Sequence, residues 1–310
     1  MPTYTKPPLT YEQQLGLLRD RGLRVDRPRE ARQVLRTVGY SRLTTYWLPL
    51  FEPGRVGERF RAGATFSDAY ARYQLDSRLR RIVLYCTDHI EVALRARVAY
   101  EASHFYGTGH WLLRPEAYRD YGKALQTVSA VLDSFGQSRD GFAREYREVY
   151  AEQSPVPPAW LALEVLTFDR LARLFINLRE GAIRRAVADD FDLPDQVLLS
   201  WLRSLQSLRN IAAHHGRLWN RALLKEPRWP NRFEHARYAW VAQWQREGES
   251  VKFYAGLCCM AWLIDEINPR NTLRGRLDEA IAAIDGPLRR ALQAEMGFPD
   301  DWRVQPLWSK

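Results

Sequence analysis

Residues 66–105 read FSDAYARYQLDSRLRRIVLYCTDHIEVALRARVAYEASHF. Apolar residues recur along this stretch every three or four positions, which is the pattern of one buried face of an α-helix. They are Leu75, Leu79, Ile82, Val83, Cys86, Ile90, Ala93, Leu94 and Ala96 to Val98. The run Thr65-Phe66-Ser67-Asp68 opens the pattern, and Tyr106-Gly107-Thr108-Gly109 closes it. The stretch therefore predicts one long helix from about Phe66 to Phe105.

Helical periodicity also dominates on both sides of this stretch. Thr10-Tyr11-Glu12-Gln13 has the form of a capping box, which opens a helix that ends near Gly22. Further helices are predicted over residues 29–37, 159–180, 251–267 and 273–295, and from residue 195 onward. Only the region of Gly54, Gly57 and Gly63 could form a small hairpin instead of a loop. The predicted fold class is therefore all-α, with a helical N-terminal region (1–64) continuous with a helical domain (65–310).

Composition favours a phosphate-bearing partner. The formal net charge is +9, and it comes almost entirely from arginine, whose planar guanidinium binds phosphate oxygens in pairs. Codon bias in a GC-rich genome is the alternative explanation for most of these arginines. The three cysteines, two of them adjacent, indicate neither a disulfide framework nor a zinc site.

No secretion signal is visible at the N-terminus. The longest apolar run, Phe253 to Ile264, is about half a membrane span, which is typical of a buried helix. We therefore expect a cytoplasmic protein that contacts no membrane and uses no metal or other cofactor.

The segment from Ser207 to Arg221, SLRNIAAHHGRLWNR, concentrates the residues that could do chemistry. If the segment is helical from Asp195 onward, its apolar face consists of Leu198, Trp201, Leu205, Leu208 and Ala212. The opposite stripe consists of Asn210, His214, Arg217 and Arg221, at spacings of four, three and four.

Arg209 lies five positions before His214, about 140° around a helix axis at ~100° per residue. One straight helix cannot direct both side chains to one point. Either the helix bends near Gly216, or a second copy of the motif completes the site. The spacing thus favours a homodimer.

An imidazole and a guanidinium together can cleave RNA without a metal. His214 would take the proton from the ribose 2′-hydroxyl, or give a proton to the leaving 5′-oxygen. Arg209 would stabilise the negative charge that develops on the pentacoordinate phosphorus. Asn210 could orient the imidazole, and the product would be a 2′,3′-cyclic phosphate. The remaining polar residues of the segment are candidate RNA contacts: His215, Arg217, Asn220 and Arg221.

The bare pattern of an arginine and a histidine with four to six residues between them is weak evidence. With six histidines and arginine at about 13% of positions, chance gives roughly two or three such pairs. Arg97 with His104 and Arg228 with His235 are further examples. A capped surface helix with a core histidine explains the pattern equally well.

The whole string from Arg209 to Arg221 resembles the signature of the Abi family of bacterial phage-resistance proteins, the AbiD/AbiF-like group. That family is placed in the HEPN superfamily of α-helical ribonucleases. The resemblance implies that Arg209 and His214 form the Arg-x4–6-His motif, with Asn210 as its usual polar neighbour. It also implies an RNase or RNA-binding effector in phage defence, whose RNA would be a single-stranded substrate or a structured small RNA. With the spacing argument above, we expect this protein to act as a homodimer.

Other segments share the resemblance over nearly the whole chain. They include Lys6 to Leu9, Gly39 to Leu43, Asp76 to Arg80, Ile90 to Arg95, Pro157 to Phe168 and the closing Gly297-Phe298-Pro299. One departure is Asp169, which stands where the family pattern leads us to expect glycine.

Three residues are candidate supports for the site. Glu91 and Arg95, one turn apart, could support it or form only a structural ion pair. Glu164 stands among apolar neighbours and could be a buried carboxylate that holds Arg209 or His214.

Two other functions remain open. The chain could be a non-catalytic scaffold that holds a structured RNA, or a protein-interaction partner in a phage-sensing complex. Trp219 is expected to be a core anchor rather than a base-stacking residue.

Overall fold

A computed structural model describes residues 7–230 and 252–309. In these ranges it contains α-helices, short 3-10 helices and isolated β-bridges, and no β-strand. The predicted all-α fold is confirmed. The α-helices are α1 (Tyr11–Asp20), α2 (Pro28–Thr37), α3 (Tyr40–Trp47), α4 (Phe66–Tyr106), α5 (Tyr121–Gln137), α6 (Gly141–Val149), α7 (Ala159–Ala162), α8 (Phe168–Asn177), α9 (Gly181–Asp189), α10 (Asp195–Ala213), α12 (Phe253–Ile267), α13 (Leu273–Ala282) and α14 (Gly286–Met296).

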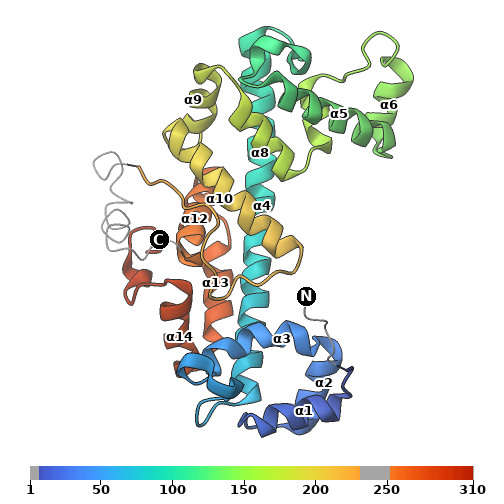
Figure 1. The fold of residues 1–310 in the computed structure, drawn as a ribbon. Coiled ribbons are helices and arrows are strands. Elements are labelled where there is room, and N and C mark those ends of the chain that lie inside the picture. The colour runs from blue at the N-terminus through green and yellow to red at the C-terminus, as the bar shows by residue number, and fades with distance from the viewer. Residues whose placement is uncertain (1–6, 231–251, 310) are drawn as a thin grey trace.

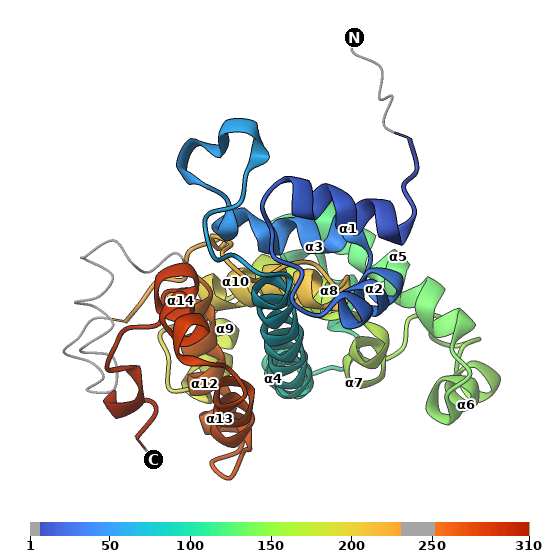
Figure 2. The same ribbon diagram turned by 90° about the horizontal axis from the view of Figure 1, so that it is seen from below.

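The long helix α4 is the axis of the fold, and its prediction is confirmed. It begins with a capping box in which the Thr65 hydroxyl accepts the Asp68 amide and the Asp68 carboxylate accepts the Thr65 amide. It ends 41 residues later at Gly107, whose left-handed φ of 64° suits glycine. Seen along its length, α4 lies at the centre, with the other helices around it (Figure 2).

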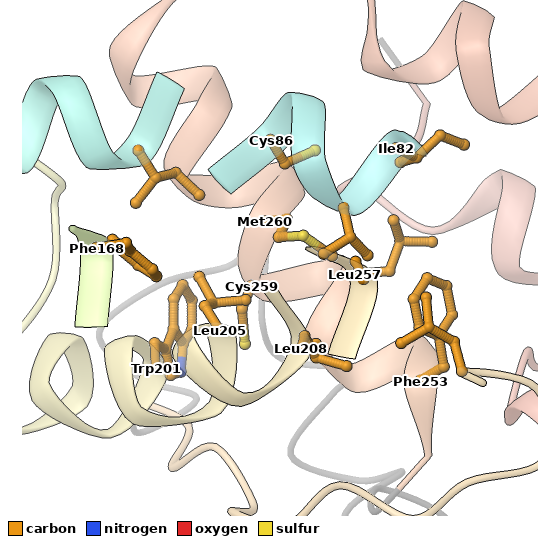
Figure 3. Close-up of a cluster of buried hydrophobic side chains, with 14 of the residues drawn as sticks. Ile82, Cys86, Phe168, Trp201, Leu205, Leu208, Phe253, Leu257, Cys259 and Met260 are labelled. Atoms are coloured by element: carbon orange, nitrogen blue, oxygen red, sulfur yellow. The ribbon is translucent and has the colours of Figure 1, made fainter. Parts of the chain in front are cut away.

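Helix α10 crosses in front of α4 and ends on the side away from α12 and α13 (Figure 1). Its predicted apolar face is buried: Leu198, Trp201, Leu205, Leu208 and Ala212 are each at most 3% exposed. These side chains meet residues of α4, α8 and α12 in one cluster (Figure 3). Burial of this face fixes the rotation of α10 about its own axis, and therefore determines which of its polar residues face outward.

The close contact between α10 and α12 depends on a glycine. A Cβ at Gly256 would lie 2.3 Å from Leu208 Cδ1, so the buried Leu208 side chain would have to shift to admit any larger residue. The neighbouring residues of α12, from Phe253 to Asp265, are all buried. The sequence-based expectation of a buried helix here is confirmed.

Among the described helices, none combines the length and apolar character that a membrane crossing requires.

Two predicted helices are interrupted. The helix predicted over 159–180 becomes α7, a 3-10 turn and α8, because Leu166 is extended and its carbonyl accepts a hydrogen bond from Arg95 Nη2 at 3.0 Å. The helix predicted over 273–295 divides into α13 and α14. There the Asp285 carboxylate accepts the Leu288 amide at 3.0 Å, and Pro287 lies in the first turn of α14, where its missing N–H breaks no helical hydrogen bond.

The glycine-rich region after α3, for which a loop or a small hairpin was expected, forms a short 3-10 helix over Pro53–Glu58. A single antiparallel bridge joins Phe51 to Phe60, and their rings stack with centroids 4.4 Å apart.

Candidate functional site

The motif helix ends earlier than its periodicity predicts. Helix α10 stops at Ala213, and His215 takes a left-handed conformation with φ of 55°. The His215 amide donates to the Ala212 carbonyl at 3.1 Å, and the Gly216 amide donates to the Ile211 carbonyl at 2.7 Å. This pair of bonds is the Schellman arrangement that terminates helices. The predicted polar stripe is therefore wrong beyond His214.

Gly216 is needed for this turn because of space. A Cβ there would lie 3.0 Å from Ile211 Cγ2 and 3.1 Å from the Ile211 carbonyl oxygen. His215, by contrast, occupies a backbone region that costs a non-glycine residue about 1–2 kcal/mol. Such strain persists only where surrounding contacts fix the backbone.

Contacts from two other helices fix it. Arg42 Nη1 of α3 donates to the His215 carbonyl at 2.6 Å, and Arg80 Nη1 of α4 lies 3.5 Å from the Gly216 carbonyl. Arg42 thus contacts the motif segment from the N-terminal helices. Its contact with the His215 carbonyl gives it a structural part at the motif.

The next residues are held by a buried carboxylate. Asp76 of α4 is fully buried and accepts the backbone amides of Leu218 at 3.0 Å and Trp219 at 2.7 Å. Its other oxygen accepts the Tyr46 hydroxyl at 2.5 Å and pairs with Arg80. Burial raises the pKa of Asp76, and its four donors partly offset that rise.

These contacts decide where the motif residues lie. His214 is the residue that caps α10, and its side chain is exposed; its amide donates to the Asn210 carbonyl at 3.0 Å. Asn210 and Arg209 are half-buried in the last turn of the helix. The three predicted catalytic residues thus occupy one helix end, with the imidazole open to solvent.

The predicted RNA contacts do not share a helical face with them. Arg217 is half-buried and lies 3.5 Å from the Asn220 carbonyl, while Arg221 is exposed in the irregular segment that follows. Asn220 is exposed and left-handed, with φ of 47°. Because α10 ends at Ala213, the spacing of these residues does not place their side chains on one helical face.

Arg209 lies near a cluster of charges on α4. Glu91 Oε1 accepts a hydrogen bond from Arg95 at 2.8 Å. Burial raises the pKa of the Glu91 carboxyl, and the guanidinium groups of Arg95 and then Arg209 partly offset the rise. The charges of Glu91 and Arg209 therefore attract each other electrostatically. The supporting role of Glu91 and Arg95 stays a prediction; the structure shows the ion pair between them.

Glu164 has a different place from the one predicted. Its side chain is 50% exposed, so it is not a buried carboxylate. It lies 3.6 Å from Arg95, and Arg95 in turn bonds to Glu91. The apolar neighbours in the sequence belong to α7 and the 3-10 turn, whose geometry points Glu164 outward and its neighbour Leu163 into the core.

The other candidates are structural. Trp219 is completely buried, as expected, and donates from its indole to Glu295 of α14. His89, His104 and His110 bond through Nδ1 to the carbonyls of Tyr85, Tyr100 and Val156 respectively. His235 lies outside the described residues. Among the described residues, no group of three or more histidine, cysteine or acidic side chains could hold a metal ion.

A family model described as Abi-like protein matches residues 33–220. The chain belongs to the Abi-like protein family. The matched range contains the long helix, the motif and the Asp76 anchor. It excludes the opening segment and Gly297-Phe298-Pro299, so the resemblance of those two segments stays a prediction. No curated protein and no solved structure is significantly similar to the chain. Membership links this Abi-like protein to abortive infection, a form of phage defence.

The anchoring of the motif segment in this Abi-like protein was not foreseen from the sequence. Asp76 and Arg80 entered the sequence analysis only as part of a family-like block. Their signal is two charged residues four apart inside an apolar stripe, where an unpaired charge would be costly. That signal identifies a buried pair but cannot name Leu218 and Trp219 as its partners.

Proposed function

We propose that this Abi-like protein is a metal-independent endoribonuclease of the HEPN type, with Arg209, Asn210 and His214 as its reacting groups. The observation that carries the proposal is the exposed His214 at the end of α10, with Arg209 and Asn210 in the turn before it. A residue that moves protons to and from a substrate must be reachable, and an exposed imidazole satisfies that requirement.

The chemistry follows from the groups present. The ribose 2′-oxygen attacks the neighbouring phosphorus while His214 accepts its proton, and the bond from phosphorus to the 5′-oxygen breaks. The leaving oxygen takes a proton from the imidazolium of a second His214 or from water, which leaves a 2′,3′-cyclic phosphate. Arg209 stabilises the additional negative charge on the phosphoryl oxygens.

Glu91 fits this scheme as a positioning residue. Its carboxylate is bonded to Arg95 at 2.8 Å, and the positive charge of Arg209 helps to offset the rise in its pKa that burial causes. A negative charge on the same side of the motif attracts the Arg209 guanidinium and would bias its orientation.

Self-association completes the proposal. Five positions separate Arg209 from His214, and the early end of α10 removes the bend near Gly216 as a way to align them on one helix. A second copy that faces the first can supply the missing group, in a two-fold arrangement in which each motif meets the other.

The test is cleavage of single-stranded RNA in EDTA by the intact protein, Arg209→Ala and His214→Ala. His104→Ala is the matched control, because His104 is also an exposed histidine near a helix end. We expect loss of at least a hundredfold in the two motif variants and none in the control. Equal activity in all four proteins would refute the proposal.

Mixing the two inactive variants tests the shared site. If Arg209 of one copy acts with His214 of the other, mixed dimers regain one intact site and about a quarter of the wild-type activity. No recovery would place both groups in one copy. RNA that is bound tightly, with steep salt dependence, but never cut would instead support the non-catalytic scaffold.

A further inference from the structure

A separate cavity lies between α5, α8 and α10. Its volume is about 790 Å³, which is within the usual range for ligand sites. Helix α8 contacts both α5 and α10, so three helices form its walls (Figure 1). The residues of its lining that matter here are Arg119, Lys123, Arg170, Arg173, Arg203 and Gln206.

The lining has an excess of positive charge. Five basic side chains face two carboxylates, those of Asp120 and Asp169. Each carboxylate already has a cation: Asp120 pairs with Lys123 at 2.9 Å, and Asp169 pairs with Arg173 at 3.0 Å.

Three guanidinium groups, those of Arg119, Arg170 and Arg203, have no carboxylate partner among the described residues. They are exposed. Burial lowers the pKa of the neighbouring Arg184, and the positive charge of Arg119 lowers it further. Cations held together without counter-charges favour an anionic ligand, because its binding relieves their mutual repulsion.

Helix α10 connects this cavity to the motif. Arg203, Gln206 and Asn210 are spaced by three and four positions, so they lie within about 60° of one another on the helix surface. Arg203 is about 10 Å from Asn210 along the axis, a length that a stacked strand spans with roughly three nucleotides and an extended one with fewer. A chain of phosphates that begins in the cavity can therefore reach the exposed His214.

We propose that the cavity between α5, α8 and α10 binds the phosphate backbone of single-stranded RNA and directs it along α10 to His214. Five basic side chains against two acidic ones favour contacts with phosphates over contacts with base edges, so we expect binding that depends little on sequence. The claim that the strand leads to His214 rests on the proposed function, because His214 is the proposed catalytic group. Binding itself can be measured without cleavage.

Asp169 lines the same cavity and affects its charge. It stands in the first turn of α8, where its carboxylate engages Arg173 and lowers the positive charge of the cavity. The residue that departs from the family pattern thus limits the affinity for the anion.

The experiment uses His214→Ala as the background, so that RNA is not consumed, and a short fluorescein-labelled oligouridylate as the probe. Binding is followed by fluorescence anisotropy at several salt concentrations. Arg170→Gln with Arg203→Gln is compared with Arg29→Gln and Arg36→Gln, which removes the same charge from the exposed side of α2. Circular dichroism checks that both proteins are folded.

We expect the cavity variant, Arg170→Gln with Arg203→Gln, to bind RNA about tenfold more weakly. The slope of log affinity against log salt concentration should fall by roughly one unit or more. The α2 variant, Arg29→Gln with Arg36→Gln, should change little in either quantity. Asp169→Asn should tighten binding. Equal affinities in the cavity and α2 variants would overturn the inference. Displacement of the probe by uridine monophosphate at the same concentration as by unlabelled oligouridylate would also overturn it, because the site would then hold single nucleotides.

Failure of the two proposals can be told apart. If the intact protein cuts no RNA but the cavity variant still binds poorly, the proposed catalysis fails and the binding cavity stands. If the intact protein cuts RNA and Arg170→Gln with Arg203→Gln cuts equally well at limiting RNA, the binding cavity fails and the catalytic proposal stands.

Discussion

The Asp76 carboxylate accepts the backbone amide of Trp219 at 2.7 Å, although 143 positions separate the two residues. The same oxygen accepts the Leu218 amide at 3.0 Å. This contact ties the segment after the motif to the central helix. It leaves His214 between two fixed points: the end of α10 on one side and the α4 anchor on the other.

Asp76→Asn should destabilise the protein by about 3 kcal/mol, because the buried Arg80 loses its counter-charge. Urea denaturation measures the change, with Asp133→Asn on the exposed side of α5 as the control. Amide hydrogen exchange should also accelerate at Leu218 and Trp219. Unchanged exchange at these amides would mean that Asp76 does not hold the segment.

Gly216→Ala should lower the free energy of unfolding by about 2 kcal/mol, since the new Cβ would crowd Ile211. Gly275→Ala is the matched change: it lies in the exposed part of α13, with nothing within 4 Å of its Cβ. There alanine should raise stability by about 0.5 kcal/mol through its better helix propensity. Thermal or urea unfolding of both variants gives the comparison, and a stable Gly216→Ala would contradict the tight turn.

Glu91→Gln should reduce RNA cleavage by roughly tenfold, because Arg209 loses the anion that orients it. RNA affinity should change little, so the loss should fall on kcat rather than KM. Glu145→Gln, at an exposed position of α6, is the control. A parallel fall in thermal stability with no effect on kcat would assign Glu91 a purely structural ion pair.

Asp120 gives a prediction with a defined pH dependence. Its hydrogen bond with Lys123 lowers the pKa of the carboxyl below its ordinary value of 3.8, so the unfolded chain binds the proton more tightly. The stability that this contact supplies is present above about pH 5 and is lost as the pH falls toward about 3. Urea midpoints of wild type and Asp120→Asn should therefore converge in acid; a constant difference would exclude this linkage.

The sequence predicted the long helix α4 closely, because a capping box, an unbroken apolar stripe and a terminal glycine all agree there. It also identified the buried face of α10. It failed at the end of α10, where spacing alone extended the helix to Arg221. The periodicity of side chains does not reveal a Schellman turn whose left-handed residue is histidine.

The site shows the same division. Arg209, Asn210 and His214 could be named from one string of residues, and Glu91 with Arg95 from their spacing. Glu164 was misplaced, because its burial was judged from its neighbours in the sequence, and an irregular backbone turns it outward.

The sequence by itself determined the helical class, the central helix and the chemical groups of the motif, since all three depend on residues close together in the chain. Only the tertiary structure decided where the motif helix stops, which buried carboxylate holds the following segment, and which arginines line one cavity. Those outcomes depend on contacts between residues far apart in the chain, such as Asp76 with Trp219 and Arg42 with His215. Local periodicity contains no information about such pairs.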